Sequence, residues 1–518
     1  MKKKVLLLLL LLFVLSAVIF ALPRLIRRHA VPGVLTADSR ELAAETMKES
    51  SFSSETVRRE TESEKESEEE SEEPVGPGYP GSGTSGGIEP EETEYDPGEP
   101  VEREKQPTSI IFASDMHYIS PSLTDYGKAF QELADDGDGK VECYMTQIWQ
   151  AFADEVIALK PDALVLSGDL TLNGEWMNHE EFAARLGALK DAGITVLVIP
   201  GNHDINNPYA TSYFGDEQSF IESVTAREFR EIYGPFGYDG AVSYAPDSLS
   251  YLYMLNETTW MLMLDTCIYD PVNEVGGRIS EDTLEWLELC LQSAYFQGIT
   301  VIPAGHHNLQ ELSRVFVEEC VIRNYDEVIG VLERYLTPLY FSGHLHVQRI
   351  LKHRKEPGTP DSTYGIWEIV SNSLIIPPCQ YGYLTCNVDG SFSYQTRNVD
   401  VSGWAAAHGE TNGDLLDFEA FSEAYLRRII KQQTYKKIDG LPEEISEELA
   451  DFYAELYRNY CAGGRVNYSE KKKEPGYKLW DRFMNPSMQF RQVEGMMKDG
   501  MEENNYAEIP NPIYLNRE

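Results

Sequence analysis

The stretch "ITVLVIPGNHD", residues 194–204, joins a short apolar run to an amide, an imidazole and a carboxylate. A run of this length, rich in β-branched residues, is typical of a buried strand. Asn202, His203 and Asp204 follow it directly. Because ligands bind at the carboxyl ends of the strands in open α/β sheets, the stretch predicts a strand that delivers polar groups to a functional edge.

Four other apolar runs end in the same way. A lone Asp or His after a strand is commonly structural, but five such strand ends in one chain predict a single site. The glycines that precede these polar residues permit turns and close backbone approach. The runs are "IIFASDMH" with Asp115 and His117, "LVLSGDL" with Asp169, "VIPAGHHN" with His306 and His307, and "YFSGHLH" with His344 and His346.

The polar residues at these strand ends are the ligand types that bind divalent metals. Two carboxylates, one amide oxygen and four imidazoles are too many for one tetrahedral ion, and they suit two ions that share a carboxylate. Oxygen and nitrogen ligands without thiolate favour Mn, Fe or Zn, and the sequence does not choose among them. The expected cofactor is a pair of divalent or mixed-valence ions. The other four histidines, His29, His179, His353 and His408, are predicted to lie at the surface.

The ordered signature D-M-H, G-D, G-N-H-D, G-H-H, G-H-L-H resembles the calcineurin-like metallophosphoesterase superfamily over about residues 108–350. The flanking "GDLTLNGE", "GNHDINNP", "GHHNL" and "SGHLHVQ", with the helical C-terminal region, are similar to secreted cyclic-nucleotide phosphodiesterases of Gram-positive bacteria. The resemblance implies an α/β (α+β) fold: a four-layer αββα sandwich of two mixed sheets, followed by a C-terminal helical subdomain.

The resemblance also implies a role for each residue of the site. Asp115, His117 and His346 would hold one metal, Asn202, His306 and His344 the other, and Asp169 would bridge the two. His203 would face the substrate phosphate and leaving group, with Asp204 orienting it, so that both count as catalytic. His306 is preferred to His307 as the ligand, since the family places its ligand directly at the strand end. His307 is expected in the second shell or facing substrate, beside Asn202 and His203.

The expected reaction is hydrolysis of cyclic nucleotide phosphodiesters, in which a hydroxide that bridges the metals attacks phosphorus in line. His203 would protonate the leaving oxygen. A phosphomonoesterase or pyrophosphohydrolase acting on nucleotides, lipid head groups or wall precursors remains an alternative, as does a non-catalytic surface-anchored binding protein. The loops 118–140 and 270–280 are expected to select the substrate, a small phosphodiester. The "DDGDG" of the first loop, residues 135–139, is interpreted as a plain turn rather than a calcium loop.

Composition divides the chain into four predicted domains. Residues 1–29 read as a signal anchor or signal peptide, because the apolar run 5–22 follows three lysines. Residues 30–107 are a tether, Glu/Ser-rich and then Pro/Gly-rich, with almost nothing apolar from about residue 41 to 104, and are expected to be disordered. Residues 108–405 are the catalytic domain and 406–518 the helical subdomain. The expected location is the cell membrane, with one N-terminal anchor and an extracellular catalytic domain, or secretion after cleavage.

Charge and cysteine content exclude some functions. A net charge of −41 argues against a nucleic-acid-binding surface. Nothing in the sequence indicates a protein partner. The seven cysteines lack metal-binding spacing and are predicted to be mostly buried thiols, with a Cys379–Cys386 bridge left open.

Overall fold

The computed structural model describes residues 104–353, 365–438 and 440–511. The predicted anchor, residues 1–29, lies outside these ranges, as does all of the predicted tether up to residue 103. The described residues begin just before the first strand, which starts at Thr108 as predicted.

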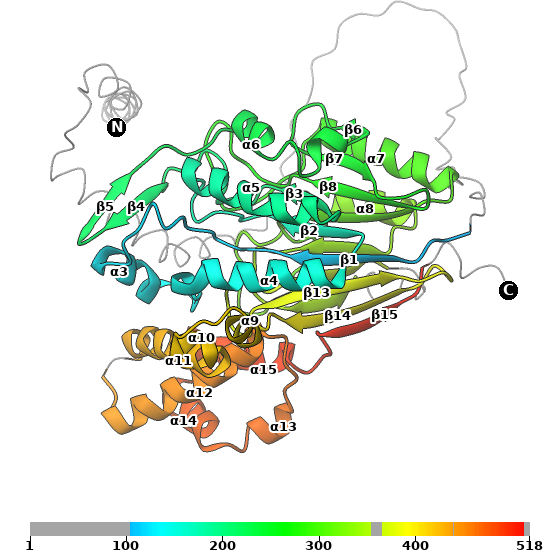
Figure 1. The fold of residues 1–518 in the computed structure, drawn as a ribbon. Coiled ribbons are helices and arrows are strands. Elements are labelled where there is room, and N and C mark those ends of the chain that lie inside the picture. Colours follow the sequence, from blue (N-terminus) through cyan, green and yellow to red (C-terminus); the bar gives the residue numbers. More distant parts are fainter. Residues whose placement is uncertain (1–103, 354–364, 439, 512–518) are drawn as a thin grey trace, which may run out of the picture. The chain divides into compact units, whose positions relative to one another are not determined.

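The first sheet has six strands in the order β15-β14-β13-β1-β2-β3 (Figure 1). Its parallel half consists of the β-branched runs that end in polar residues, in the register Ile111↔Leu164 and Leu164↔Val196. Its other half is antiparallel, so the sheet is mixed. The strands are β1 (Thr108–Ala113), β2 (Ala163–Ser167), β3 (Thr195–Ile199), β13 (Gln380–Cys386), β14 (Phe392–Asn398) and β15 (Tyr506–Ile509).

The second sheet is also mixed and has seven strands in the order β11-β12-β10-β9-β8-β7-β6. A separate two-stranded hairpin is formed by β4 (Thr211–Phe214) and β5 (Glu217–Phe220). The strands of the second sheet are β6 (Ser243–Tyr244), β7 (Tyr251–Met254), β8 (Thr259–Leu264), β9 (Thr300–Gly305), β10 (Leu339–Ser342), β11 (Arg349–Lys352) and β12 (Trp367–Val370).

The two sheets pack face to face. Phe112 of β1 and Phe341 of β10 stack with ring centroids 3.6 Å apart and planes 4° from parallel. Every residue of β8 is buried, because Met261 and Met263 enter the core between the sheets while Leu262 and Leu264 face a second core under the outer helices. The strand is therefore covered on both faces.

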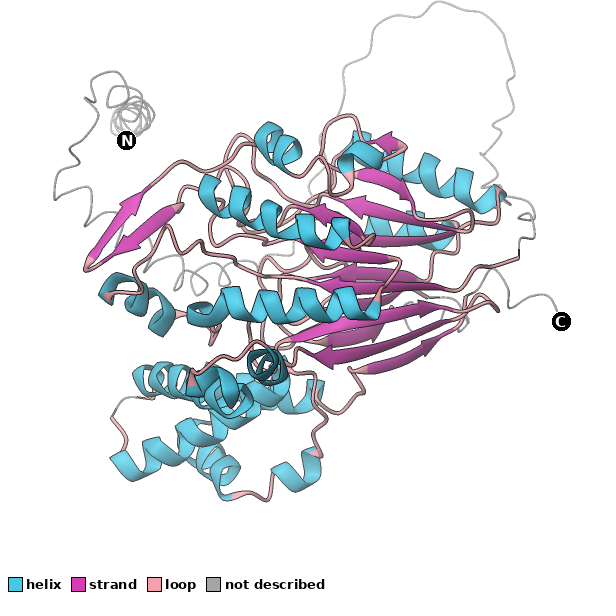
Figure 2. Ribbon diagram, viewed as in Figure 1, coloured by secondary structure: helices cyan, strands magenta, loops and turns pink. Residues whose placement is uncertain are grey.

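Helices cover the outer faces of the sandwich (Figure 2). Aromatic and aliphatic residues of α4 and α5, among them Phe152 and Phe182, join the core of the first sheet, and Leu287 of α7 and Val328 of α8 join the core outside the second. The predicted αββα sandwich is confirmed. These helices and their neighbours are α3 (Lys128–Asp136), α4 (Met145–Leu159), α5 (Trp176–Asp191), α6 (Ala226–Ile232), α7 (Glu281–Phe296) and α8 (Tyr325–Arg334).

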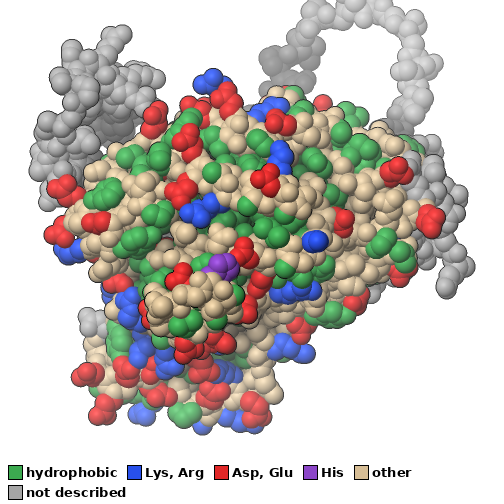
Figure 3. All heavy atoms as spheres, in the orientation of Figure 1, with side chains coloured by type: hydrophobic (Ala, Val, Ile, Leu, Met, Phe, Trp, Pro, Cys, Tyr) green, Lys and Arg blue, Asp and Glu red, His purple; other side chains and the backbone are tan. Residues whose placement is uncertain are grey.

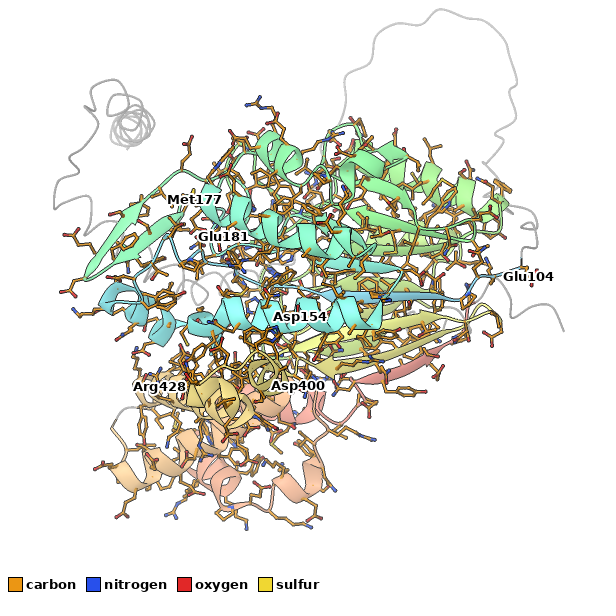
Figure 4. The ribbon with its side chains drawn as sticks, in the orientation of Figure 1. Glu104, Asp154, Met177, Glu181, Asp400 and Arg428 are labelled. Carbon is orange, nitrogen blue, oxygen red and sulfur yellow. The ribbon has the colours of Figure 1, made fainter. Side chains whose placement is uncertain are left out.

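The C-terminal region is helical, as predicted, and packs on the sandwich through a third apolar core (Figure 1). Trp404 of α9 also donates a hydrogen bond to Asp154 of α4 at 3.1 Å; Asp154 and the N-cap residue Asp400 are labelled in Figure 4. The helices are α9 (Val401–Ala407), α10 (Gly413–Leu416), α11 (Phe418–Lys437), α12 (Glu443–Cys461), α13 (Tyr468–Lys471), α14 (Pro475–Met484) and α15 (Met488–Asp499).

Two features of this region differ from the prediction. Within the helical subdomain predicted for residues 406–518, the stretch 479–498 is divided between α14 and α15, because Pro486 lacks the N–H that a continuous helix requires and Ser487 caps the new helix. The chain then returns from the helices to the sandwich, since β15 pairs antiparallel with β14 at the edge of the first sheet.

The prediction of a membrane location is corrected. Among the described residues no helix is both long and apolar enough to cross a bilayer. The longest of them, α11 and α12, have 20 and 19 residues, but charged side chains recur along both, whereas a span needs about 20 mainly apolar residues. The candidate segment 5–22 lies outside the described ranges. The predicted anchor and extracellular location are therefore withdrawn.

The surface and the cysteines complete this description. On the face shown in Figure 3, acidic and basic side chains are interspersed over the C-terminal helices. All seven cysteines are free thiols, and five of them are buried. The Cys379–Cys386 bridge that the sequence left open is therefore not formed.

Candidate metal centre

The five predicted strand ends meet at one edge of the sandwich. Residues after β1, β2, β9 and β10 supply two groups of candidate metal ligands, and within each group the ligand atoms lie within 4.8 Å of one another. Asp169 belongs to both groups. The first is Asp115, His117, Asp169 and His346, and the second is Asp169, His306 and His344.

The backbone turns sharply where these residues leave their strands. Non-glycine residues rarely adopt a left-handed conformation, which costs on the order of 1–3 kcal/mol and concentrates at functional sites. Five of the candidate ligands have positive φ and so point into the site immediately after an extended strand. They are Asp115 (55°), His117 (43°), Asp169 (47°), His344 (70°) and His346 (53°).

The first group is tightly clustered. The Nε2 atoms of His117 and His346 are 3.0 Å apart, and Nε2 of His346 lies 3.3 Å from Oδ1 of Asp115. Oδ2 of Asp169 lies 3.8 Å from Nε2 of His117. Three of the four side chains are almost fully buried, and His346 is 15% exposed.

The second group includes Asn202 as well. Nε2 of His306 lies 3.1 Å from Oδ1 of Asn202 and 3.4 Å from Oδ2 of Asp169. Nδ1 of His344 is 3.3 Å from the same His306 nitrogen. Oδ2 of Asp169 therefore faces both groups, which is the arrangement expected of a shared ligand.

The donor atoms fit metal ions. Two ligands bound at about 2.1 Å, with about 90–110° between them, lie about 3.0–3.4 Å apart, which covers most of these separations. The tautomers also fit: Nδ1 of His306 donates to Ser167 O at 2.8 Å and Nδ1 of His346 lies 2.6 Å from Oδ2 of Asp138, so each Nε2 is left with a lone pair. The cluster can hold metals through these atoms.

The buried charges of the centre shift the pKa values of their neighbours in opposite directions. Burial alone would raise the pKa of Asp169, but His306, His203 and His117 outweigh it and hold that pKa well below its usual range. Burial would lower the pKa of His306, but Asp169 and Asp115 raise it to about 9. For His346, burial and Lys140 oppose a rise, but Asp138 and Asp115 bring its pKa to about 9. Without metal, these two rings carry protons at neutral pH.

His203 lies beside the shared carboxylate and is its most exposed neighbour. Its backbone N–H donates to Oδ1 of Asp169 at 2.9 Å, and its ring Nε2 lies 4.0 Å from Oδ2. The side chain is 36% exposed, against 3% for Asp169. Burial lowers the pKa of His203, and this effect outweighs the neighbouring charge of Asp169, which raises it. The ring is thus placed to contact a molecule bound at the cluster.

The predicted partner of His203 is corrected. Asp204 does not contact the ring; its carboxylate accepts hydrogen bonds from the backbone N–H groups of Gly201, Leu170 and Thr171 and so ties β2 to β3. The ring is oriented instead by Leu172 O at 2.8 Å and Asn173 Oδ1 at 3.0 Å, both bonded to Nδ1. Asp204 is structural because it follows His203 on a turn that faces the protein interior.

His307 lies next to the second group without joining it. Its Nδ1 bonds the Thr266 hydroxyl at 2.8 Å and its Nε2 bonds Val275 O at 2.8 Å. Both ring nitrogens are therefore satisfied inside the protein and are not presented to substrate, contrary to the substrate-binding role predicted for this residue. The preference for His306 over His307 as candidate ligand agrees with the geometry.

His179 was predicted to lie at the surface, and this is wrong. The ring is fully buried on α5, 3.0 Å from the Tyr233 hydroxyl and 2.9 Å from Asp204 O, and burial lowers its pKa to about 3. For two of the other histidines that were predicted to lie at the surface, the structure agrees better with the prediction. His408 is exposed and stacks on Trp404, and His353 is partly exposed and pairs with Glu333. His29 lies outside the described residues.

Sequence reasoning missed two residues of the centre. Asn173 lies in the quoted "GDLTLNGE", and Asp138 in the "DDGDG" that was interpreted as a plain turn. A polar residue close after a strand-end ligand was the available signal for Asn173. No local signal identifies Asp138, because it reaches His346 from a position 208 residues earlier in the chain.

A two-sheet sandwich with paired His/Asp clusters that share one carboxylate defines the class of dimetal phosphoesterases. In agreement, residues 108–348 match the model of the calcineurin-like phosphoesterase family, and residues 400–503 match that of the C-terminal domain of cyclic nucleotide phosphodiesterase. The protein therefore contains a calcineurin-like phosphoesterase domain, which is a hydrolase fold acting on phosphoesters, followed by a cyclic nucleotide phosphodiesterase C-terminal domain.

Solved structures with a similar fold have low sequence identity. A dimetal phosphatase from Danio rerio is 14% identical, with a TM-score of 0.41 over 56% of this chain and 96% of that one. The structure titled PhoD is 12% identical, with a TM-score of 0.34 over 57% and 66%. TT1561 of Thermus thermophilus is 12% identical, with a TM-score of 0.28 over 57% and 100%. No curated protein sequence matches the chain.

Proposed function

We propose that the protein is a metal-dependent phosphodiesterase that hydrolyses cyclic nucleotides. The observation that carries the proposal is the position of Asp169 Oδ2, which lies 3.4 Å from His306 Nε2 and 3.8 Å from His117 Nε2 and so joins the two ligand groups. The C-terminal match to cyclic nucleotide phosphodiesterases supports this choice of substrate.

In this proposal the seven predicted ligands keep their roles. Asp115, His117 and His346 would hold one ion, Asn202, His306 and His344 would hold the other, and Asp169 would serve both. When bound, a pair of Mn, Fe or Zn ions supplies an activated water and charge that stabilises the phosphoryl oxygens. The ligand residues are held in place before the ions bind, because most of them have a positive φ and buried side chains that leave them little freedom.

His203 is the proposed general acid. Leu172 O and Asn173 Oδ1 both accept from Nδ1, so the ring can give a proton to substrate only as imidazolium, from Nε2. The charge of Asp169 favours this form, whereas burial lowers the pKa of His203. That nitrogen lies on the side of Asp169, where the leaving oxygen of a bound phosphodiester would be. Proton transfer by a positioned ring typically contributes about 10²- to 10⁴-fold to the rate.

A cavity beside the centre suits the nucleoside part of the substrate. It has a volume of about 630 Å³, within the usual range for small-molecule sites, and its wall includes Cys267 and Tyr269. The thiol of Cys267 donates to Pro200 O, and Tyr269 O accepts from Asn206, so this wall adjoins the turn that carries Asn202. Its many carboxylates disfavour phosphate but can accept hydrogen bonds from the amino groups of a base.

A substrate panel tests the proposal. The metal-loaded protein is assayed with 2′,3′-cyclic and 3′,5′-cyclic nucleotides, a bis-aryl phosphodiester and a mono-aryl phosphate. We expect a higher kcat/KM for a cyclic nucleotide than for the mono-aryl phosphate, and loss of activity after metal removal. Preference for the monoester would indicate a phosphomonoesterase instead. Full activity without metal would refute the proposed metal-dependent mechanism.

A further inference from the structure

His346 is held from behind by an acidic residue of a distant loop. Its Nδ1 lies 2.6 Å from Oδ2 of Asp138, while its Nε2 faces Asp115 and His117 in the first ligand group. Asp138 also pairs with Lys140, whose Nζ lies 3.2 Å from Oδ1. The carboxylate is therefore fixed between an ammonium group and an imidazole.

We propose that the C-terminal helical domain is a structural part of the metal centre, and that it acts by holding Asp138 as the positioning residue of His346. The inference rests on the proposed function in one respect, because it takes His346 to be a metal ligand. It assigns to the C-terminal domain a task that is distinct from substrate binding.

The chemistry of the Asp138–His346 pair is that of an outer carboxylate on a ligand histidine. When Nδ1–H donates to the carboxylate, the tautomer is fixed and the lone pair is at Nε2, directed at the cluster. The negative charge of Asp138 also increases the basicity of Nε2. Loss of such a partner typically weakens metal binding about 10- to 100-fold.

The loop that carries Asp138 is held by α11. Arg428 pairs with Asp135 at 2.7 Å, Lys436 pairs with Asp136 at 3.0 Å, and the side chain of Gln433 donates to Gly137 O. Figure 4 labels Arg428. One face of α11 thus contacts the last two residues of α3 and Gly137, which lies directly before Asp138.

Gly139, directly after Asp138, adds a further contact with α11. Its φ is +94°, and a Cβ built there would lie 2.9 Å from Cγ of Leu426 on α11. The loop backbone therefore packs directly against the helix, without room for a side chain between them. Asp138 is fixed in position by a helix that contributes none of the candidate ligands.

The backbone after His346 is also held by the C-terminal domain. Gln348 N–H donates to Cys461 O at 2.9 Å, and the Gln348 side chain donates to Asn504 O at 2.8 Å. Arg349 lies against Asp499, donating to its backbone oxygen. The C-terminal domain consequently fixes both the ring of His346, through Asp138, and the chain on which His346 lies.

Metal titration of the full chain tests the inference. Metal-free protein is titrated with Co²⁺ and followed by its visible absorption, and the two affinities are obtained from a stepwise fit. The wild type is expected to bind two equivalents. Asp138→Asn removes the charge but keeps the size, and we expect one of the two affinities to fall about 10- to 100-fold while the other changes less than about twofold.

Two matched controls separate positioning from general damage. Glu132→Gln removes a charge of the same sign from α3, at an exposed residue that pairs with Lys128 of the same helix and not with α11, and it is expected to retain both affinities within about twofold. Gln433→Ala removes the contact of α11 with Gly137 and should weaken the same site by on the order of 2- to 10-fold, because one hydrogen bond is lost. Gln432→Ala, on the neighbouring exposed position of α11, should have no effect.

The outcomes distinguish this inference from the proposed function. Restoration of Asp138→Asn activity by excess metal, with KM unchanged, supports positioning. If the wild type binds two Co²⁺ ions and Asp138→Asn binds both with unchanged affinity, the inference is overturned, but the proposed function is not affected. A wild type that binds no Co²⁺ would overturn both. If Asp138→Asn unfolds, Gln433→Ala decides, and equal affinities in Gln433→Ala and Gln432→Ala would overturn the inference.

Discussion

The backbone N–H of His203 donates a hydrogen bond to Oδ1 of Asp169 at 2.9 Å, so the carboxylate whose other oxygen faces both ligand groups also fixes the turn that carries the proposed acid. Metal binding and proton transfer are therefore coupled through one side chain. The contact uses the backbone N–H of His203, and its ring is not among the candidate ligands, so removal of the ring should leave the ligand groups in place. Variants at the two residues should consequently have different effects.

His203→Ala should retain metal and lose rate. We expect kcat to fall about 10²- to 10⁴-fold, because the leaving oxygen loses its proton donor, with metal content unchanged. Asn173→Ala should lower kcat less, since Leu172 O still accepts from Nδ1. Steady-state kinetics and metal analysis on the same preparations check this. Loss of metal in His203→Ala would show that the ring is a ligand.

Metal binding at neutral pH should release protons. His306 and His346 each have a pKa of about 9 without metal, so both rings must lose a proton before Nε2 can bind. Affinity should therefore rise with pH up to about 9 and level off above it. Calorimetry at pH 7 in buffers of different ionisation enthalpy should give close to two side-chain protons per pair of ions. Binding with no proton release would contradict the assignment of these ligands.

Gly343→Ala should disrupt the first ligand group. A Cβ at this position would lie 1.9 Å from Ser114 Oγ and 2.6 Å from Asp115 Oδ2, so the ligand carboxylate must shift. We expect metal affinity to fall by more than tenfold and stability by about 1–3 kcal/mol. Gly187→Ala, in open space on α5, is the control and should stabilise by about 0.5–1 kcal/mol. Equal behaviour of the two variants would show that the close approach is not required.

Glu368 should make the protein less stable as the pH rises. Burial raises its pKa to about 8, above the ordinary value of 4.5, so between these values the unfolded chain has released a proton that the folded state keeps. The free energy of unfolding therefore falls from about pH 4.5 to about pH 8 and the contribution is constant above that. Glu368→Gln, which keeps an acceptor for Leu309 N–H, should reduce this slope by up to a few kcal/mol over the range.

Thermal unfolding at pH 5 and pH 8 measures this difference. The melting temperature of Glu368→Gln should change less between the two pH values than that of the wild type. An identical change in both proteins would show that Glu368 is charged in the folded state.

The sequence predicted the sandwich and its ligand edge well, because buried strands and the polar residues after them are local patterns. The helical spacing of Leu284, Leu287 and Leu291 in residues 281–296 was the available signal for α7, which the sequence analysis did not predict. Sequence reasoning misplaced His179 and the partner of Asp204. The positions of His179 and Asp204 depend on which side of each segment faces the protein interior. This is decided by the packing between α5 and the turn after β3.

Long-range contacts account for the other differences. The pairing of β15 with β14 joins residues 506–509 to 392–395, and the Asp138–His346 contact spans 208 positions. In neither case does spacing along the chain indicate the partner. Such contacts follow from the way the C-terminal helices dock on the sandwich, which periodicity alone does not determine.

Metal stoichiometry of the wild type and Asp169→Ala tests the central claim most directly. If Asp169 joins two ligand groups, the purified wild type should bind two ions per chain, and Asp169→Ala should bind neither tightly and lose turnover. A variant that still binds two ions and hydrolyses a phosphodiester at the wild-type rate would contradict the account.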